Sequence, residues 1–187
     1  MFCMDTSVLS CTDPSKRSLD PLALAWLEAN SDRVYVPAIV LTEIQRGIDR
    51  LELSGKTAKA RELRDWFAAT KLQFLGRIQP VDAAVALRAG QLLAEAELKS
   101  SSISVADGLV AATAYVHGWR ILTRDRNDFR AFGVAMADFS VGLPRRVGQL
   151  DLPFLARLPT GSPEGVNETE ELEAVQPSAE PELGKAP

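Results

Sequence analysis

Residues 34–51 read V-Y-V-P-A-I-V-L-T-E-I-Q-R-G-I-D-R-L, a short apolar run followed at once by an amphipathic segment. The run Val34–Val36 is typical of a buried strand, and Pro37 suits the first position of a helix because proline fixes φ near its helical value. Apolar residues then recur at helical spacing, at Val40, Ile44, Ile48 and Leu51. A strand that leads directly into a helix is the unit of α/β domains with a parallel sheet.

The same alternation extends along most of the chain. Further strands are predicted at 2–5, 77–81 and 120–123, and a last one within 129–139 after a short helix. Further helices are predicted from Pro21, over 56–75 after a break at Ser54-Gly55, from Asp82, and over 104–117 before Gly118. The expected apolar faces of the first and third of these helices are Leu22, Trp26 and Leu27, and Val85, Leu87, Leu92 and Leu93.

Bulk composition favours a globular protein of the cytoplasm. The chain has 187 residues, of which 46% are apolar and 25% are charged. No apolar stretch approaches the roughly 18 residues of a membrane span, and the N-terminus lacks the basic and apolar regions of a signal peptide. Two cysteines build neither a disulfide framework nor a cysteine-rich zinc site.

The C-terminal part differs from the rest in charge. Residues 158–187 contain seven Glu and one Lys, a net of −6, so the remainder carries +2 of the total of −4. The same segment holds five of the eleven prolines and no aromatic residue. Because it has little apolar surface to bury, we predict a folded domain over 1–145 and an acidic, Pro-rich extension over 146–187, disordered from about residue 158.

Five acidic residues lie at the ends of predicted elements. Asp5 and Asp125 follow strands, at the edge of a parallel sheet where ligands bind. The alternative is that each begins a turn or caps the following helix. Asp128 follows in the same segment, T-R-D-R-N-D-F.

Glu43 and Asp107 lie early in helices. Glu43 borders the apolar stripe of its helix, and Gly47 follows it by one turn, leaving room for a bulky group or allowing close helix packing. Ser104 to Asp107 fits the S-x-x-[DE] capping box, which is compatible with a shared site. Small residues follow Asp107 and predict close packing of that helix: Gly108, Ala111, Ala112 and Ala114.

These acids favour a hard-cation site over other chemistries. Carboxylates brought together repel one another unless they share protons or hold a metal, and oxygen-only ligands favour Mg²⁺ or Mn²⁺. The single histidine, His117, precedes Gly118 at a helix end and is interpreted as a helix cap. No Gly-rich phosphate loop is present. Metal-assisted attack of water on a phosphodiester is the chemistry that such a site serves best.

Four segments carry a resemblance to a known family: M-D-T-S at 4–7, P-A-I-V-L-T-E-I-Q-R-G-I at 37–48, S-V-A-D-G-L-V-A-A-T-A at 104–114 and H-G-W-R-I-L-T-R-D-R-N-D-F at 117–129. In order and spacing, over about residues 1–140, the chain resembles PIN-domain ribonucleases, and most of all the VapC/FitB-type toxins of type II toxin–antitoxin systems. The resemblance implies a three-layer α/β/α sandwich with a central parallel sheet. The acidic tail departs from the family pattern.

The resemblance also implies roles. Asp5, Glu43 and Asp107 correspond to family acids that bind Mg²⁺ or Mn²⁺ for RNA cleavage, and the fourth acid is Asp125 or Asp128, of which Asp125 is favoured. Thr6, Ser7 and Thr123 resemble the hydroxyls that support the site. The resemblance implies that the helix after Gly55 helps to bind a VapB-type antitoxin and that Arg46 contacts RNA or antitoxin. It also implies that the toxin is a homodimer.

Three alternatives remain open or are set aside. A PIN nuclease of RNA maturation or turnover would have the same body, and an adjacent antitoxin gene distinguishes the two. A non-cleaving PIN-like binding protein would not need the full set of acids. A phosphatase of the HAD type needs a second Asp two residues after Asp5, where this chain has Ser7.

Overall fold

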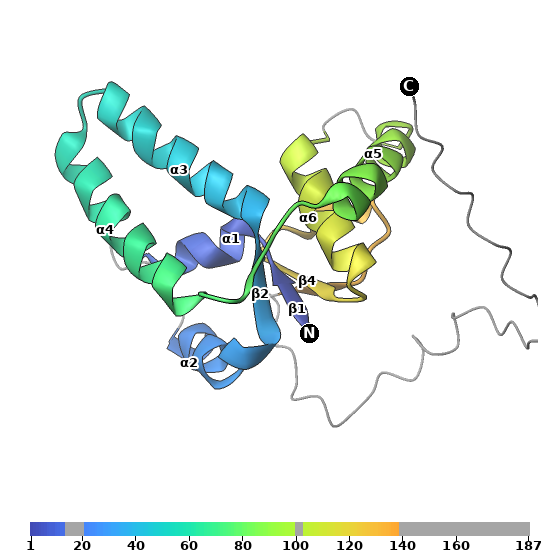
Figure 1. Ribbon diagram of the computed structural model, residues 1–187, viewed down its shortest axis with the longest axis horizontal. Helices are drawn as coiled ribbons and strands as arrows, with labels where there is room; N and C mark the ends of the chain where they lie inside the picture. Colours follow the sequence, from blue (N-terminus) through green and yellow to red (C-terminus); the bar gives the residue numbers. More distant parts are fainter. Residues whose placement is uncertain (14–20, 100–102, 139–187) are drawn as a thin grey trace, which may run out of the picture. The chain divides into compact units, whose positions relative to one another are not determined.

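The computed structural model describes residues 1–13, 21–99 and 103–138. Figure 1 shows these residues as helices and strands. Contacts divide the chain after Arg146, and every described residue belongs to the first unit. The predicted N-cap Asp20, the loop 100–102 and the predicted extension 146–187 therefore lie outside the described residues.

Five parallel strands form one sheet in the order β3-β2-β1-β4-β5. Their bounds are Phe2–Met4 for β1, Val34–Pro37 for β2, Ile78–Gln79 for β3, Arg120–Thr123 for β4 and Met136–Asp138 for β5. The expected parallel sheet is thus confirmed. Because β1 is central and Met4 pairs with Leu122, the carboxyl ends of β1 and β4 lie side by side.

Both faces of the sheet are covered, as the alternation of side chains along β1 shows. On one face the Cys3 thiol donates a hydrogen bond to the Val110 carbonyl oxygen of α6, which runs over Val105–Val116 (3.6 Å). On the other face the Phe2 ring meets Trp26 of α2, Pro21–Ala29, edge to face at 5.3 Å. The predicted three-layer α/β/α arrangement is confirmed.

Two helical pairs flank the sheet. Helices α3, Ala38–Leu53, and α4, Thr57–Gln73, form an antiparallel hairpin that turns at Gly55, whose φ of 80° is readily accessible only to glycine (Figure 1). Helix α5, Ala83–Glu97, packs along α6. Short helices complete the domain: α1 Thr6–Leu9, α7 Arg126–Arg130, and the 3₁₀ turns Ser10–Thr12 and Ser31–Arg33.

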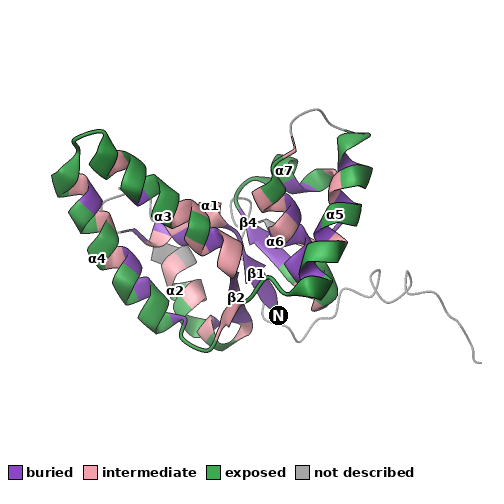
Figure 2. Cartoon of the chain, turned by 45° about the horizontal axis from the view of Figure 1, so that its top comes forward, coloured by how far each residue is buried: buried purple, intermediate pink, exposed green. Residues whose placement is uncertain are grey.

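One predicted core position is wrong. Leu87 is 73% exposed, because the buried face of α5 consists of Val85, Ala89, Leu92 and Ala96, which lie on the opposite side of the helix. Figure 2 shows this division, with exposed and buried residues on opposite sides of α5. Leu87 is two residues from Val85 and five from Leu92, so its spacing does not match the helical period of the buried face.

Of the two explanations offered for Gly47, close helix packing is not observed. A Cβ added there would meet nothing within 4 Å, so the explanation by close packing is wrong and open space beside Glu43 remains. The close approach occurs instead at Gly108 of α6, where an added Cβ would lie 2.7 Å from Leu93. The expected close packing of this helix against the sheet is confirmed separately, since α6 contacts β1, β2 and β4 and Ala111, Ala112 and Ala114 are fully buried.

Within the described ranges, no helix combines the length and the apolar character needed to cross a membrane.

Candidate functional site

Asp5 is anchored at the carboxyl end of β1. Its backbone N–H donates to the Leu122 carbonyl oxygen of β4 (3.0 Å), and its buried side chain caps α1. Carboxylate oxygen Oδ2 accepts from the Ser7 hydroxyl (2.6 Å), the Ser7 N–H (3.3 Å) and the Thr123 hydroxyl (3.0 Å). Among the described residues no hydrogen bond reaches Oδ1. One oxygen is therefore held in place while the other is left available to a ligand.

Glu43 approaches the same end of the sheet from α3. It is half-buried in the second turn of the helix, and its oxygen Oε2 accepts a hydrogen bond from the Thr6 hydroxyl. Thr6 and Ser7 are neighbours in α1, so this one short helix holds two of the acids. The three hydroxyls expected to support the site, those of Thr6, Ser7 and Thr123, are all found bonded to its acids.

Asp107 lies half-buried in the first turn of α6. Burial raises its pKa to about 7, and the negative charges of Asp128, Asp5 and Glu43 act in the same direction, while a hydrogen bond from the Ser104 side chain opposes them. Ser104 is also the N-cap of α6, as predicted, although its hydroxyl accepts from Ala106 N–H (3.1 Å). The structure thus brings Asp107 within electrostatic range of three other acids.

The two acids after β4 differ in their environment. Both are exposed, and Asp125 caps α7, with Oδ1 accepting from the Asn127 N–H (3.1 Å). Asp128 lies in the first turn of α7, and its pKa is raised by partial burial and then by the charges of Asp125 and Asp5. The charge of Asp128 acts on Asp107, whereas Asp125 is not among the charges that raise the pKa of Asp107.

The donor set suits a hard divalent cation. It consists of carboxylates supported by hydroxyls, and the repulsion that raises the pKa of Asp107 is the kind that a bound cation relieves. With the side chains where they lie, no three Asp, Glu, His or Cys residues of the described ranges are grouped closely enough to hold a metal ion. The chemistry therefore fits Mg²⁺ or Mn²⁺, and a cation would have to draw the carboxylates closer together.

Two residues that the sequence did not single out help to join α1 to the segment after β4. The Arg124 N–H donates to the Ser7 hydroxyl (3.1 Å), and its guanidinium contacts the Cys11 sulfur (2.6 Å). The Cys11 thiol in turn donates to the Ser7 carbonyl oxygen (3.0 Å). The spacing of Ser7 and Cys11 along one helical turn was visible in the sequence, but the partner 113 residues away had no local signal.

His117 has the structural position expected of it. It is the C-cap residue of α6, and its ring stacks on Trp119 with centroids 4.5 Å apart. Trp119 stacks in turn on Tyr35 (4.3 Å).

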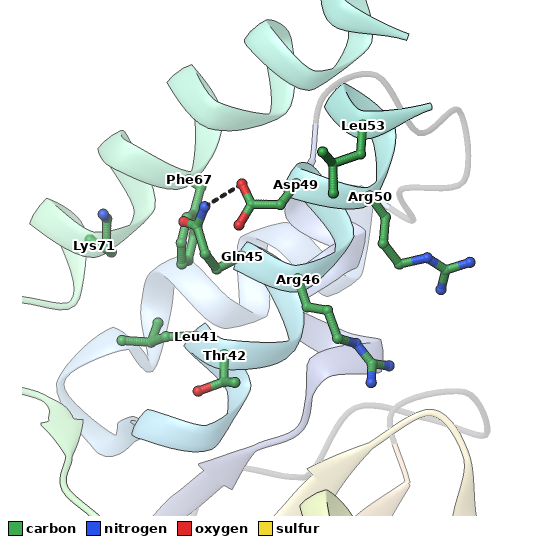
Figure 3. A pocket seen from close by; sticks show the side chains of 9 residues that line it. All are labelled: Leu41, Thr42, Gln45, Arg46, Asp49, Arg50, Leu53, Phe67 and Lys71. Atoms are coloured by element: carbon green, nitrogen blue, oxygen red, sulfur yellow. Dashed lines mark hydrogen bonds between the residues drawn. The ribbon is translucent and has the colours of Figure 1, made fainter. Parts of the chain in front are cut away.

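A groove of about 680 Å³ lies between α3 and α4 (Figure 3). Leu41, Leu53 and Phe67 provide its apolar surface. Arg46, Arg50 and Lys71 add positive charge, and Gln45 donates to Asp49 across one turn of α3 (2.9 Å). Arg46 is three residues from Glu43, so the groove extends along the helix that carries an acid of the site.

The fold and the site together define a parallel α/β domain with acids gathered where β1 and β4 end. The chain belongs to the PIN domain family, whose model matches residues 2–134. This confirms the membership predicted from the four sequence segments.

Individual relatives agree with this assignment. Toxin FitB of Neisseria gonorrhoeae is 35% identical over 138 residues, which cover 73% of this chain and 96% of that protein. VapC ribonuclease Y4jK of Sinorhizobium fredii is 30% identical over 135 residues, covering 72% and 94%. Among solved structures, that of FitAcB from Neisseria gonorrhoeae superimposes with a TM-score of 0.63 at 33% identity, covering 74% of this chain and 98% of the other.

Proposed function

We propose that this protein is a metal-dependent endoribonuclease that acts as the toxin of a VapBC-type toxin–antitoxin module in the cytoplasm. The observation that carries the proposal is the geometry at the carboxyl end of β1, where Ser7 and Thr123 hold Oδ2 of Asp5 and Thr6 of the same short helix holds Glu43. Relatives named ribonuclease VapC support the choice of RNA as the substrate. Hydrolysis of a phosphodiester bond is the reaction assigned to the site.

Asp5, Glu43 and Asp107 would hold Mg²⁺ or Mn²⁺, and we assign Asp128 as the fourth acid. The sequence favoured Asp125, which caps α7 as Asp5 caps α1; Asp128 is preferred because its charge acts on Asp107. A divalent cation bound there supplies Lewis-acid polarisation of the phosphodiester and lowers the pKa of water. Asp125 then acts by holding α7 in place.

The protein's own groups prepare the site for the cation. Ser7 and Thr123 fix Oδ2 of Asp5 and so orient Oδ1, while Thr6 fixes Oε2 of Glu43. Asp107, whose pKa is raised to about 7 by burial and by the neighbouring acids, is about half protonated near pH 7 when no cation is present. Asp107 would hold a cation as its ionised carboxylate, which a positive charge would stabilise.

The test of cleavage uses purified protein and single-stranded RNA with Mg²⁺ or Mn²⁺. Asp5→Asn should abolish cleavage while the protein still folds, and excess EDTA should abolish cleavage by the wild type until Mn²⁺ is restored. Asp65→Asn, at an exposed position on α4, is the matched control and should cleave normally. Full activity of Asp5→Asn, or of the wild type in EDTA, would falsify the proposal.

We further propose that a VapB-type antitoxin neutralises the protein, and that the toxin is a homodimer. The solved relatives FitAcB and FitAB, the latter bound to an IR36 DNA fragment, support a toxin–antitoxin assembly. The groove between α3 and α4 combines apolar side chains with Arg46, Arg50 and Lys71, which suits an acidic amphipathic antitoxin segment.

Co-expression with the adjacent open reading frame tests the antitoxin. Growth should stop when the protein is expressed alone and recover when the neighbouring gene is present, and the Asp5→Asn variant should be harmless in both cases. RNA cleavage without any effect of the neighbour on growth would instead favour a nuclease of RNA maturation or turnover.

A further inference from the structure

Leu93 of α5 packs directly against Gly108 in the first turn of α6. A Cβ added to Gly108 would lie 2.7 Å from both Cγ and Cδ2 of Leu93 and 3.2 Å from Cδ1. Separations below 3.0 Å are essentially never found for real Cβ atoms. The branched end of Leu93 therefore occupies the space that any other side chain at position 108 would need.

This contact lies in the same helical turn as Asp107. The Gly108 N–H donates to the Ser104 carbonyl oxygen (3.0 Å), so the turn from 104 to 108 moves as a unit. Gly108 and Val110 are buried, and Leu93 packs against the same core as Val110. Leu93 therefore packs directly against the turn that carries Asp107.

Other helical glycines of the described residues show no such contact. A Cβ at Gly90 of α5 or at Gly47 of α3 would meet nothing within 4 Å. Since glycine is unfavourable inside a helix relative to alanine, its presence at position 108 needs a local reason, and the Leu93 contact supplies one.

We propose that Gly108 and Leu93 are positioning residues whose contact places the Asp107 carboxylate among the other acids. The inference rests on the proposed nuclease function and deepens it. A methyl group at position 108 needs about 0.7 Å more room to reach the 3.4 Å at which ordinary contacts begin, and either the half-buried Leu93 side chain turns or the first turn of α6 moves. If the turn moves by this amount, Asp107 moves with it, and displacements of about 1 Å at a reacting centre cost roughly 10²-fold in rate.

Gly108→Ala is the test, with Gly90→Ala as the matched control. Two quantities are measured for each: the rate of RNA cleavage and the affinity for Mn²⁺ by calorimetry. We expect Gly108→Ala to lose about tenfold or more in both quantities, while its melting temperature shows that it is folded, and Gly90→Ala to match the wild type. Leu93→Ala creates the missing space, so the double variant Leu93→Ala/Gly108→Ala should return to within about threefold of Leu93→Ala alone.

Two results would overturn the proposal. The first is wild-type cleavage and Mn²⁺ affinity in Gly108→Ala, which would mean that the Leu93 side chain turns away. The second is a folded double variant whose cleavage and Mn²⁺ affinity stay as low as those of Gly108→Ala. If Gly108→Ala does not fold, the comparison of Leu93→Ala with the double variant carries the test alone. The Mn²⁺ measurement is independent of cleavage. A wild type that binds Mn²⁺ without cutting RNA would refute the proposed function and still permit the positioning test.

Discussion

Replacing Asp107 by Asn should stabilise the metal-free protein at alkaline pH. The pKa of Asp107 is raised from 3.8 to about 7 in the folded state. At pH 8 its carboxylate is therefore ionised, and the negative charge destabilises the folded state relative to the unfolded state. A shift of about three units corresponds to about 4 kcal/mol. Partial solvent access reduces this to about 2 kcal/mol, and the favourable position of a carboxylate at a helix N-terminus removes up to about 1 kcal/mol more.

The expected gain for Asp107→Asn is therefore about 1 kcal/mol at pH 8 without metal. Because the folded-state pKa lies above the unfolded value, the penalty is fully present above about pH 7 and fades as the pH falls toward 4. Asn keeps the size of the side chain and an acceptor for Ser104. The structural role of this position in the helix is therefore largely preserved.

Urea unfolding of both proteins in EDTA, at several pH values between 4 and 8, measures this difference. Asp65→Asn is the control and should show a small difference from the wild type that does not change with pH. A difference for Asp107→Asn that stays constant with pH, or a variant less stable than the wild type at pH 8, would refute the electrostatic reasoning. Added Mn²⁺ should stabilise the wild type more than the variant.

Two further predictions concern the groups around Asp5. Asp128→Asn should reduce cleavage by about 10²-fold or more. Asp125→Asn should reduce it by much less, because Asn is as good an N-cap as Asp. If Asp125→Asn cleaved more slowly than Asp128→Asn, Asp125 would be the fourth acid. Ser7→Ala and Thr123→Val each remove a hydroxyl donor from Oδ2 of Asp5 and should lower both the cleavage rate and the Mn²⁺ affinity about 10- to 100-fold. Unchanged values would show that the backbone alone holds Asp5.

The sequence predicted most of the elements because their signals are local. Pro37 does begin a helix as its N-cap, and Asp82 caps α5 through the Val85 N–H (2.9 Å). Gly118, with φ of 64°, does end α6. The short helix near 129 was misplaced, since α7 begins at Arg126, where Asp125 caps it, and the short helix α1 was not among the predicted helices.

Packing between elements was less predictable. Leu87 is as apolar as Leu92, yet only Leu92 faces the core. The identity of the side chain does not indicate which face of α5 packs against the rest of the domain. The sequence likewise made Gly47 and Gly108 equally plausible points of close contact. The position of α5 relative to α6 decided in favour of Gly108.

By itself the sequence determined the class of fold, the family and the set of acids from which a site can be built. These depend on apolar periodicity, on capping residues and on the order of short segments, all of which are properties of the chain. Only the tertiary structure decided that Ser7 and Thr123 share one oxygen of Asp5, and that the Thr6 hydroxyl binds Glu43. Hydrogen bonds and charge interactions depend on distances between residues far apart in the chain, and those distances exist only after the strands have paired and the helices have packed.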